Sequence, residues 1–298
     1  MGFFDERAGL HGKRAAVVGG ASGIGEAVSV ALAQAGVDVA LLDLRADAVP
    51  SIVDKVRAAG RHALGVVGDA CELTALEKFF LAIDQEFGHL DILVNVAGGT
   101  VQRRFMDSSP LDHARDVRRN YGYVLDSVQL AVPLIRRSGR GGSIVNFTTI
   151  EAHRGAAGFA VYAGAKAALT NFSRALAVEL GAEQIRVNTL VPDTTPSQGN
   201  AEAIPEPLRS RMAEVPLPAM LQNLAMYIPL KAPPMPENLA DGVLFLVSDL
   251  ARFVTGTALH VDGGTMAAAG FLEWPDGEGH LPVATPTAAR RLFGDGIP

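Results

Sequence analysis

Short apolar runs alternate with longer helical patterns along most of the chain. The runs cover residues 15–18, 37–42, 63–67, 90–94 and 143–147, and a further strand is expected to end at Val261. Short continuous apolar runs are typical of strands that are buried on both faces of a parallel sheet. Their alternation with helices, at intervals of about thirty residues, predicts an α/β fold with a doubly wound, Rossmann-like parallel sheet.

Helical patterns fill the intervals between these runs. Alanine-rich or amphipathic segments continue to Ala35 and then cover residues 47–59, 71–87, 109–137 and 237–250. In such a sheet, ligands bind at the carboxyl ends of the strands. The residues that directly follow each apolar run are therefore the candidates for a binding site.

Composition and charge narrow the class of protein. The 298 residues are 48% hydrophobic and 19% charged, which is enough for a substantial core, and we expect one domain over residues 1–298. A net charge of -6 and a pI near 5.7 argue against nucleic acid as a partner, because phosphate-backbone binding needs a basic surface. Cys71 is the only cysteine, so no intrachain disulfide indicates an oxidising compartment.

The N-terminus and the hydrophobic pattern bear on location. The first ten residues carry acids and bases where a secretory signal needs an apolar core, and no apolar run reaches membrane-spanning length. We therefore expect a cytoplasmic protein without a membrane partner.

A glycine-rich turn joins the first expected strand to the first helix. It reads Gly-Gly-Ala-Ser-Gly-Ile-Gly over residues 19–25. Glycines here allow a tight turn that brings backbone N–H groups and the helix N-terminus against a pyrophosphate. The alternative is a glycine-rich loop without a ligand. The cofactor-binding residues expected in this turn are Gly19, Ser22, Gly23, Ile24 and Gly25.

Two aspartates follow the second and third expected strands. Asp43 lies roughly twenty residues past the glycines, where an acid accepts hydrogen bonds from both ribose hydroxyls and repels a 2′-phosphate. This position favours NAD over NADP, although Arg45 is close enough to keep NADP as the less favoured alternative. Asp69, followed by Ala70, could contact the adenine or cap the next helix, and the sequence does not decide between these roles.

Small residues follow the fourth expected strand. The segment after residue 94 reads Asn-Val-Ala-Gly-Gly, and small residues past a strand permit close approach of a ligand or of another backbone. Asn95, Ala97 and Gly98 are therefore further candidates for cofactor binding.

Tyr162 and Lys166 lie four residues apart in an alanine-rich segment. If the segment is helical, both side chains share one face. A nearby ammonium stabilises the phenolate and lowers the pKa of the phenol, which would make Tyr162 a proton donor and acceptor near neutral pH. The alternative is a chance pairing, since a short motif is a hypothesis until its context supports it.

In order along the chain, these motifs resemble those of the classical short-chain dehydrogenase/reductase family. The resemblance extends over residues 10–265 and leaves a C-terminal extension at 266–298. It is carried by the Gly-x-x-x-Gly-x-Gly turn, the Asn-x-Ala-Gly motif, a lone Asn120 in a helix, Thr149 after the fifth strand, Tyr-x-x-x-Lys, Arg186-Val187-Asn188 leading to Pro192, and Val261-Asp262-Gly263-Gly264.

The resemblance implies catalytic roles for four residues. Tyr162 would exchange a proton with the substrate oxygen while the nicotinamide exchanges a hydride with the carbon, and Lys166 would lower the Tyr162 pKa and bind the nicotinamide ribose. Thr149, where the family usually has serine, would hydrogen-bond the substrate oxygen. Asn120 would support a water-linked proton relay through Lys166. The structural alternatives are a helix kink for Asn120 and a strand end for Thr149.

The resemblance also implies contacts to the nicotinamide carboxamide and an assembly. The contacts would come from Pro192 and from a downstream hydroxyl, for which Ser197 fits the family spacing best and Thr195 is the alternative. Asp193 replaces the usual glycine, and its carboxylate could alter cofactor affinity or face the substrate. Members of the family commonly form homotetramers or homodimers.

Val18 and Val96 replace a threonine and an asparagine that stabilise each other in the family. Replacing both partners of a buried polar contact with apolar groups can be nearly neutral. We therefore hypothesise that the two valines are a matched apolar substitution that keeps the centre of the sheet packed.

The segment 194–236 is rich in proline and cannot be one regular helix. By resemblance it would cover the substrate, and its Met and Leu residues suggest a largely apolar one; alternatively they fill core or subunit contacts. The tail from Phe271 has no periodicity, and it could cross to another subunit through aromatic residues or lie disordered. His153 has no partners at ligand spacing, so no metal site is expected.

These observations predict an NAD(H)-dependent oxidoreductase that interconverts a secondary alcohol and a ketone. Two alternatives belong to other classes: a nucleotide-binding sensor or scaffold without catalysis, and an epimerase or dehydratase that regenerates its cofactor internally. The identity of the substrate is beyond the sequence.

Overall fold

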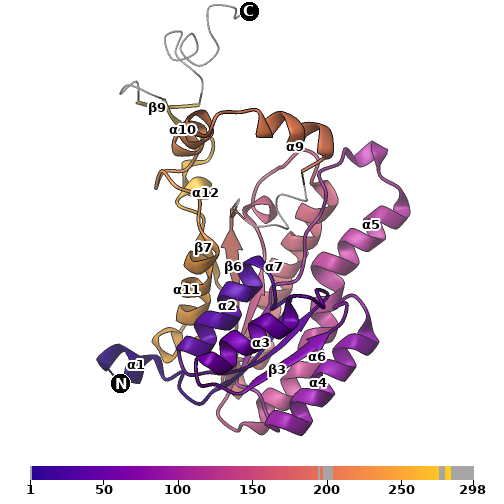
Figure 1. The fold of residues 1–298 in the computed structure, drawn as a ribbon, viewed down its shortest axis with the longest axis vertical. Coiled ribbons are helices and arrows are strands. Elements are labelled where there is room, and N and C mark those ends of the chain that lie inside the picture. The colour runs from indigo at the N-terminus through magenta and orange to yellow at the C-terminus, as the bar shows by residue number, and fades with distance from the viewer. Residues whose placement is uncertain (1, 194, 197–203, 275–278, 283–298) are drawn as a thin grey trace, which may run out of the picture.

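Seven parallel strands form one sheet in the order β3-β2-β1-β4-β5-β6-β7 (Figure 1). The structure is a computed structural model that describes residues 2–193, 195–196, 204–274 and 279–282. The predicted doubly wound parallel sheet is confirmed, and the strand order reverses between β1 and β4, where such sheets bind ligands. The strands of this sheet are β1 (Arg14–Val18), β2 (Asp38–Asp43), β3 (Ala63–Val67), β4 (Ile92–Asn95), β5 (Gly142–Phe147), β6 (Ile185–Pro192) and β7 (Ala258–Val261).

Helices cover both faces of the sheet. One face is covered by α2 (Gly23–Gln34), α3 (Val49–Ala58) and α11 (Pro236–Val247), and the other by α4 (Leu73–Phe87), α6 (Tyr123–Arg137) and α7 (Ala160–Leu180). The remaining helices described are α1 (Phe3–Ala8), α5 (Pro110–Val117), α9 (Glu206–Ala213), α10 (Leu217–Tyr227) and α12 (Thr265–Ala268), with short turns η1 (Phe105–Asp107), η2 (Arg118–Gly122), η3 (Ile150–Ala152), η4 (Gly181–Glu183) and η5 (Asp249–Ala251).

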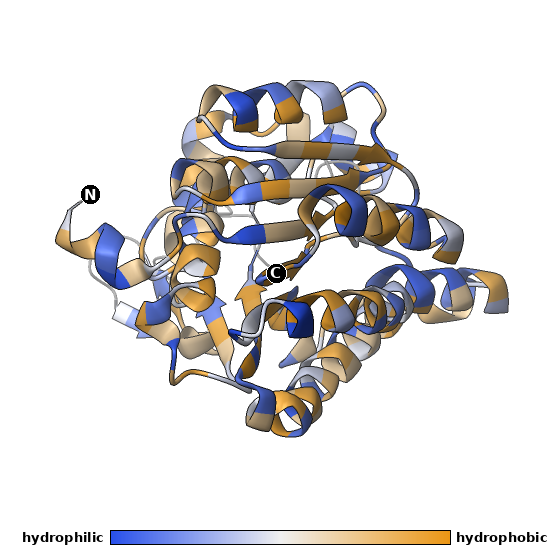
Figure 2. Ribbon diagram, turned by 90° about the horizontal axis from the view of Figure 1, so that it is seen from below, coloured by the Kyte–Doolittle hydropathy of each residue, from blue (hydrophilic) through white to orange (hydrophobic). Residues whose placement is uncertain are grey.

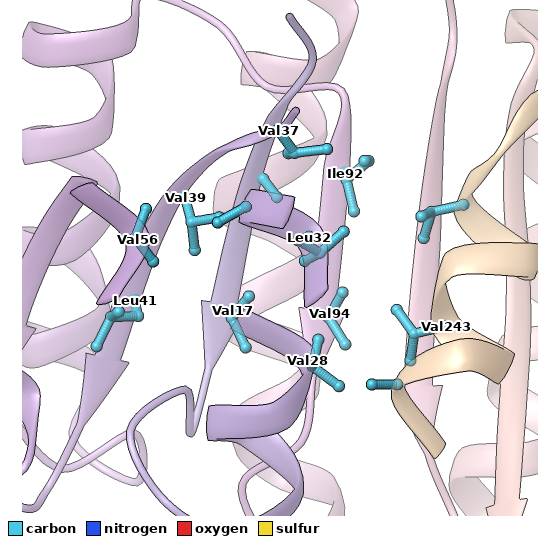
Figure 3. Packing of buried hydrophobic residues seen from close by; sticks show 14 of the residues in the cluster. Val17, Val28, Leu32, Val37, Val39, Leu41, Val56, Ile92, Val94 and Val243 are labelled. Atoms are coloured by element: carbon cyan, nitrogen blue, oxygen red, sulfur yellow. The ribbon is translucent and has the colours of Figure 1, made fainter. Parts of the chain in front are cut away.

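Alternate residues of each central strand supply two separate cores. Val17 packs with Val28 and Leu32 of α2, whereas Val18 packs in the core on the opposite face. Figure 3 shows the first core, in which side chains of α2 and Val243 of α11 lie beside those of the strands. Burial on both faces explains why the strands read as continuous apolar runs. The outer helices mix hydrophilic and hydrophobic residues, as Figure 2 shows.

Val18 and Val96 both pack at the centre of the sheet, but on opposite faces of it. Their backbones meet, because the Val96 N–H donates to the Val18 carbonyl at 2.9 Å. Val18 is in register with Asn95, so Val96 lies one position further on and its side chain points to the other face. The two valines keep the sheet packed without touching through their side chains, and their compensation for each other stays a hypothesis.

The expected helix at 109–137 is interrupted. α5 and α6 are joined by η2, a π-helical turn, rather than by regular α-helix. The expected helix at 237–250 is also shorter, because α11 ends at Val247 before the turn η5. Single π-turns are often found at functional sites, and η2 contains Asn120.

The proline-rich segment contains two short helices, α9 and α10. This agrees with the prediction that the segment cannot form one regular helix. Figure 1 shows both helices beyond the carboxyl ends of the strands. Met212, Leu217, Met220 and Leu221 are exposed within the chain, so these four do not fill its core, and subunit contacts stay a prediction for them.

Part of the tail is ordered into a hairpin that the sequence pattern did not reveal. β8 (Leu272–Trp274) and β9 (Gly279–Leu281) pair antiparallel. Trp274 is buried, and its indole Nε1–H donates to the Leu281 carbonyl at 3.0 Å. Its aromatic surface is therefore already covered by its own chain and is not a free anchor for another subunit.

Candidate active site

The glycine turn after β1 has the geometry of a ligand cradle. Gly19 adopts a φ of 85°, and a Cβ there would lie 2.6 Å from the Ala97 nitrogen. A Cβ on Gly25 would lie 1.7 Å from the Gly19 carbonyl oxygen. Both positions therefore exclude every side chain, so the turn packs closely against the helix that follows it. The N-cap of α2, Ser22, makes no capping hydrogen bond with its side chain, which leaves the helix N-terminus suited to an anion.

Asp43 ends β2 beside this turn and is buried. Its carboxylate accepts the Ala21 N–H at 2.8 Å and the Arg45 N–H at 3.0 Å. The Arg45 guanidinium makes an ion pair with Asp47 at 3.2 Å. Asp43 thus fixes the glycine turn to the end of β2, and its charge lies where a ribose is expected.

Asp69 does not cap α4. Its Oδ1 accepts the Cys71 N–H at 2.8 Å, two residues on, whereas the N-cap of α4 is Glu72. The capping alternative for Asp69 is therefore wrong, and the contact with adenine stays a prediction. Ala70 packs against the core below this turn.

The three candidates after β4 divide into two kinds. The Asn95 side chain is buried and satisfied within the sheet, because Nδ2 donates to Asn146 at 2.9 Å and Oδ1 accepts the Ser127 hydroxyl at 2.8 Å. Only the Asn95 backbone is left to meet a cofactor. Ala97 and Gly98 lie at the carboxyl edge of the sheet, where the Ala97 carbonyl accepts the hydroxyl of the buried Tyr123 at 2.7 Å.

Asn120 lies in the π-turn η2 and is fully buried. Its amide accepts the Gly99 N–H at 2.9 Å and donates to the carbonyls of Gly99 and Asp116, each at 3.0 Å. A Cβ on Gly98 would lie 2.9 Å from Asn120 Oδ1 and 3.2 Å from Lys166 Nζ. The interrupted helix therefore brings Asn120 to the same point as Lys166, so the kink and the proposed relay are compatible.

Lys166 and Tyr162 lie on α7 as the spacing predicted. Lys166 is buried, and its Nζ donates to the Phe147 carbonyl at the end of β5, at 2.8 Å. Tyr162 is partly buried, its ring stacks edge-on against Phe159, and its hydroxyl hydrogen-bonds Thr149. A small cavity of about 20 Å³ borders Tyr162, with Arg103, His113 and Asp116 among its lining residues.

The expected pKa of Tyr162 is not what the residues of the chain produce. Burial and the Glu151 carboxylate raise the Tyr162 pKa to about 12, while the hydrogen bond with Thr149 acts in the lowering direction. Burial also lowers the pKa of Lys166 to about 8. Desolvation and a nearby carboxylate both oppose ionisation of a phenol, and Lys166 is not among the groups that shift the Tyr162 pKa here, so its lowering effect stays a prediction.

Thr149 follows β5 and is buried. Its hydroxyl donates to the carboxylate of Glu151, which in turn accepts the Arg154 guanidinium at 2.9 Å. No motif of the sequence indicated that Glu151 and Arg154 are partners of Thr149. The spacing of two residues between Thr149 and Glu151 was the available signal.

The end of β6 approaches the same site. Pro192 is the last residue of the strand, and both Asp193 and Thr195 are buried after it. The Thr195 hydroxyl donates to the Asp193 carbonyl at 3.0 Å. Ser197, the other candidate, lies outside the described residues. Asp193 faces Tyr227 at the end of α10, with which it shares a hydrogen bond.

Among the residues that the structure describes, no three His, Cys, Asp or Glu side chains gather as a metal site requires. Among the same residues, no helix is long and apolar enough to cross a membrane.

Comparisons with known proteins agree with this fold. Residues 19–266 match a family model described as "Enoyl-(Acyl carrier protein) reductase". The L-rhamnose 1-dehydrogenase (NAD(P)(+)) of Sphingomonas sp. (strain SKA58) is 33% identical over 257 residues, which are 86% of this chain and 96% of the relative. The 7alpha-hydroxysteroid dehydrogenase of Escherichia coli (strain K12) is 31% identical over 258 residues, or 86% and 94% of the two chains.

A solved structure extends the comparison to three dimensions. Carveol dehydrogenase from Mycobacterium avium, in complex with NAD, superposes with a TM-score of 0.78 at 27% identity, covering 86% of this chain and 98% of the other. The protein therefore belongs to the short-chain dehydrogenase/reductase family, as the motifs predicted. It is an oxidoreductase of that family.

Proposed function

We propose that the protein is an NAD(H)-dependent dehydrogenase that interconverts a secondary alcohol and a ketone, with Tyr162 as the proton carrier. The observation that carries this proposal is the convergence of Tyr162, Thr149 and Lys166 at the end of β5, next to Asn120. A proton acceptor, a hydroxyl and a buried ammonium at the edge of a nucleotide-binding sheet are the groups that hydride exchange at a carbinol carbon requires from a protein.

The residues that would hold the cofactor fit a dinucleotide. The turn at Gly19 and Gly25 admits no side chain, and the uncapped N-terminus of α2 offers N–H groups to a pyrophosphate. Ser22, Gly23 and Ile24 belong to this turn, and Asp69, Ala70, Asn95, Ala97, Gly98, Pro192 and Thr195 would line the rest of the groove. When bound, the nicotinamide exchanges a hydride with the substrate carbon.

Asp43 supports NAD rather than NADP. Its buried carboxylate lies at the end of β2, and Arg45, the nearby cation, makes an ion pair with Asp47. A 2′-phosphate would meet the Asp43 charge at short range. The same relatives include one whose name gives NAD(P), so the preference is a proposal for this chain.

The proposed proton steps use the hydrogen bonds of the site. In the oxidation direction, Tyr162 takes the hydroxyl proton of the alcohol, and Thr149 holds the substrate oxygen in place. Lys166 would bind the ribose hydroxyls and, with Asn120 beside it at Gly98, would pass the proton onward through water. In the reduction direction, Tyr162 donates the proton to the ketone oxygen.

The substrate is proposed to be largely apolar. The support is the set of exposed apolar side chains on α9 and α10, which lie beyond the carboxyl ends of the strands (Figure 1). A cytoplasmic location and a homotetramer or homodimer complete the proposal, and both stay predictions.

The proposal is tested by incubating the protein with NAD and a panel of secondary alcohols, from cyclohexanol to hydroxysteroids, while NADH absorbance is followed. NADH formation with at least one alcohol is expected, with slower turnover when NADP replaces NAD. Tight NADH binding without turnover of any alcohol would instead favour a sensor or scaffold. A changed product without net NADH would favour an epimerase or dehydratase.

A further inference from the structure

Glu151 is the one carboxylate that Thr149 contacts in the described part of the site. Thr149 has a single hydroxyl hydrogen, whereas two neighbours can accept it: the Glu151 carboxylate and the oxygen of Tyr162. An ionised carboxylate only accepts hydrogen bonds, so the hydrogen of Thr149 lies toward Glu151 while Tyr162 is protonated. In that arrangement Thr149 accepts a hydrogen bond from Tyr162 and offers the substrate only lone pairs.

The negative charge of Glu151 opposes ionisation of Tyr162, as the competition for the Thr149 hydrogen does. The Glu151 side chain is 19% exposed, so its negative charge is only partly screened from the phenol. Ionisation of Tyr162 places a second negative charge beside it and requires the Thr149 hydrogen to turn away from the carboxylate. Both effects oppose the phenolate, and both depend on Glu151.

Arg154 connects Glu151 to α10. Its guanidinium donates to Glu151 Oε1 at 2.9 Å and lies 5.8 Å from the centroid of the Tyr227 ring. Tyr227 is the last residue of α10 and hydrogen-bonds both Arg154 and Asp193. An unbroken row of contacts thus runs from α10 to the hydroxyl of Thr149.

We propose that Glu151 is a positioning residue that competes for the hydroxyl hydrogen of Thr149, and that Arg154 and Tyr227 make this competition depend on the position of α10. When α10 draws Arg154 toward Tyr227, Glu151 is neutralised less and holds the Thr149 hydrogen more strongly. When Arg154 engages Glu151 fully, the hydrogen is released toward Tyr162 and the substrate oxygen. This inference rests on the proposed catalytic role of Tyr162.

Other charged groups border Tyr162 and must be distinguished from Glu151. Lys166 lies on the same helix, and three further groups line the cavity beside Tyr162, from the segment before α5 and from α5 itself. These groups are Arg103, His113 and Asp116. None of these three hydrogen-bonds Thr149 among the contacts described, whereas Glu151 does.

The first test measures the ionisation of Tyr162 without any substrate. The full chain is labelled at the ζ-carbon of tyrosine, the Tyr162 signal is assigned with Tyr162→Phe, and NMR follows its titration up to about pH 11. Glu151→Gln keeps an acceptor for Thr149 but loses the negative charge. It should lower the pKa of Tyr162, which raises the acid dissociation constant of the phenol about tenfold. Glu183→Gln, which removes a glutamate paired with Arg136 at 2.6 Å on the surface, is the matched control and should leave the titration unchanged.

A Tyr162 titration that is the same in Glu151→Gln and in the wild type would overturn the proposal. This result is distinct from failure of the proposed function, because the NMR signal reports Tyr162 whether or not the protein turns over an alcohol. Retained turnover in Tyr162→Phe would remove the proposed function instead.

The second test concerns the coupling to α10. With the alcohol that reacts fastest in the screen, the pH dependence of kcat is measured for Tyr227→Ala, alone and combined with Glu151→Gln. Tyr227→Ala should shift the pH profile of kcat in the wild-type background. In the Glu151→Gln background, Tyr227→Ala should leave the pH profile of kcat unchanged. Equal shifts in both backgrounds would mean that Tyr227 acts independently of Glu151, which would overturn the proposed coupling.

Discussion

Lys166 is a buried lysine whose ammonium donates to the Phe147 carbonyl. Burial lowers its pKa from 10.5 to about 8, so the charged form is less stable in the folded protein than in water. Between these two pH values the unfolded chain binds more protons than the folded one, and stability therefore rises with pH. Below pH 8, Lys166 is protonated in both the folded and the unfolded chain, and the full free-energy cost of burying its charge lowers the stability.

Replacing Lys166 with methionine should therefore stabilise the protein while abolishing turnover. We expect the free energy of unfolding at neutral pH to rise by about 2 kcal/mol, because an apolar side chain of similar shape removes the desolvation cost. The gain should shrink as the pH rises from about 8 toward 10.5. Urea denaturation at neutral and at alkaline pH measures it, and a variant that is less stable at neutral pH would contradict this account of the buried charge.

Asp43 combines a structural and a proposed binding role. Its two carboxylate oxygens accept the N–H groups of Ala21 and Arg45, so Asp43→Asn keeps the shape but turns one acceptor into a donor and removes the charge. In Asp43→Asn, NADH loses a charged acceptor for its ribose hydroxyls, whereas NADPH loses the repulsion of its 2′-phosphate. We therefore expect the ratio of the Kd for NADH to the Kd for NADPH to rise about tenfold. Fluorescence titration with both cofactors measures this ratio, and an unchanged ratio would show that Asp43 does not select between them.

At the scale of elements, the turn between β1 and α2 is the most constrained feature. In Gly25→Ala, the added Cβ would meet the Gly19 carbonyl at 1.7 Å, and a backbone group cannot move away as a side chain can. NADH binding should weaken by at least about tenfold, because the turn must open. Gly181→Ala is a control, since a Cβ there meets nothing within 4 Å, and it should bind NADH normally. Normal NADH binding by Gly25→Ala would contradict the proposal that this turn holds the cofactor.

The sequence predicted the elements well where periodicity and composition act locally. β3 has the predicted bounds, and β1, β2, β4 and β5 lie within a residue or two of them, because strands covered on both faces read as apolar runs. The π-turn η2 escaped prediction, since one extra residue in a helical turn leaves no compositional mark. The hairpin of β8 and β9 was missed because its strands are only three residues long.

The sequence predicted which residues form the site, but it predicted less well which groups their side chains contact. Tyr162, Lys166, Thr149 and Asn120 meet at one edge of the sheet, as their order along the chain and the family motifs implied. The Asn95 side chain points instead to Asn146 and Ser127, on a strand and a helix far along the chain. Which side chains Thr149 and Asn95 contact depends on how elements pack, and a motif does not contain that information.

The whole molecule brings the two halves of the site together at the point where the strand order reverses. The glycine turn follows β1, whereas Tyr162 and Lys166 lie on α7 after β5, and the segment that includes α10 extends beyond both (Figure 1). One continuous sheet with helices on both faces supports our proposal that residues 1–298 form a single domain. The turn binds the cofactor, in this account, and α7 supplies the proton.

The most direct test of the proposed function is Tyr162→Phe, which removes one hydroxyl and keeps the ring that stacks against Phe159. With the best alcohol of the panel, turnover should fall at least about a thousandfold, the magnitude of a lost acid/base group. The Kd for NADH, measured by fluorescence titration, should stay within about twofold of the wild-type value. A Tyr162→Phe protein that binds NADH normally and retains most of its turnover would contradict the role of Tyr162 as proton carrier.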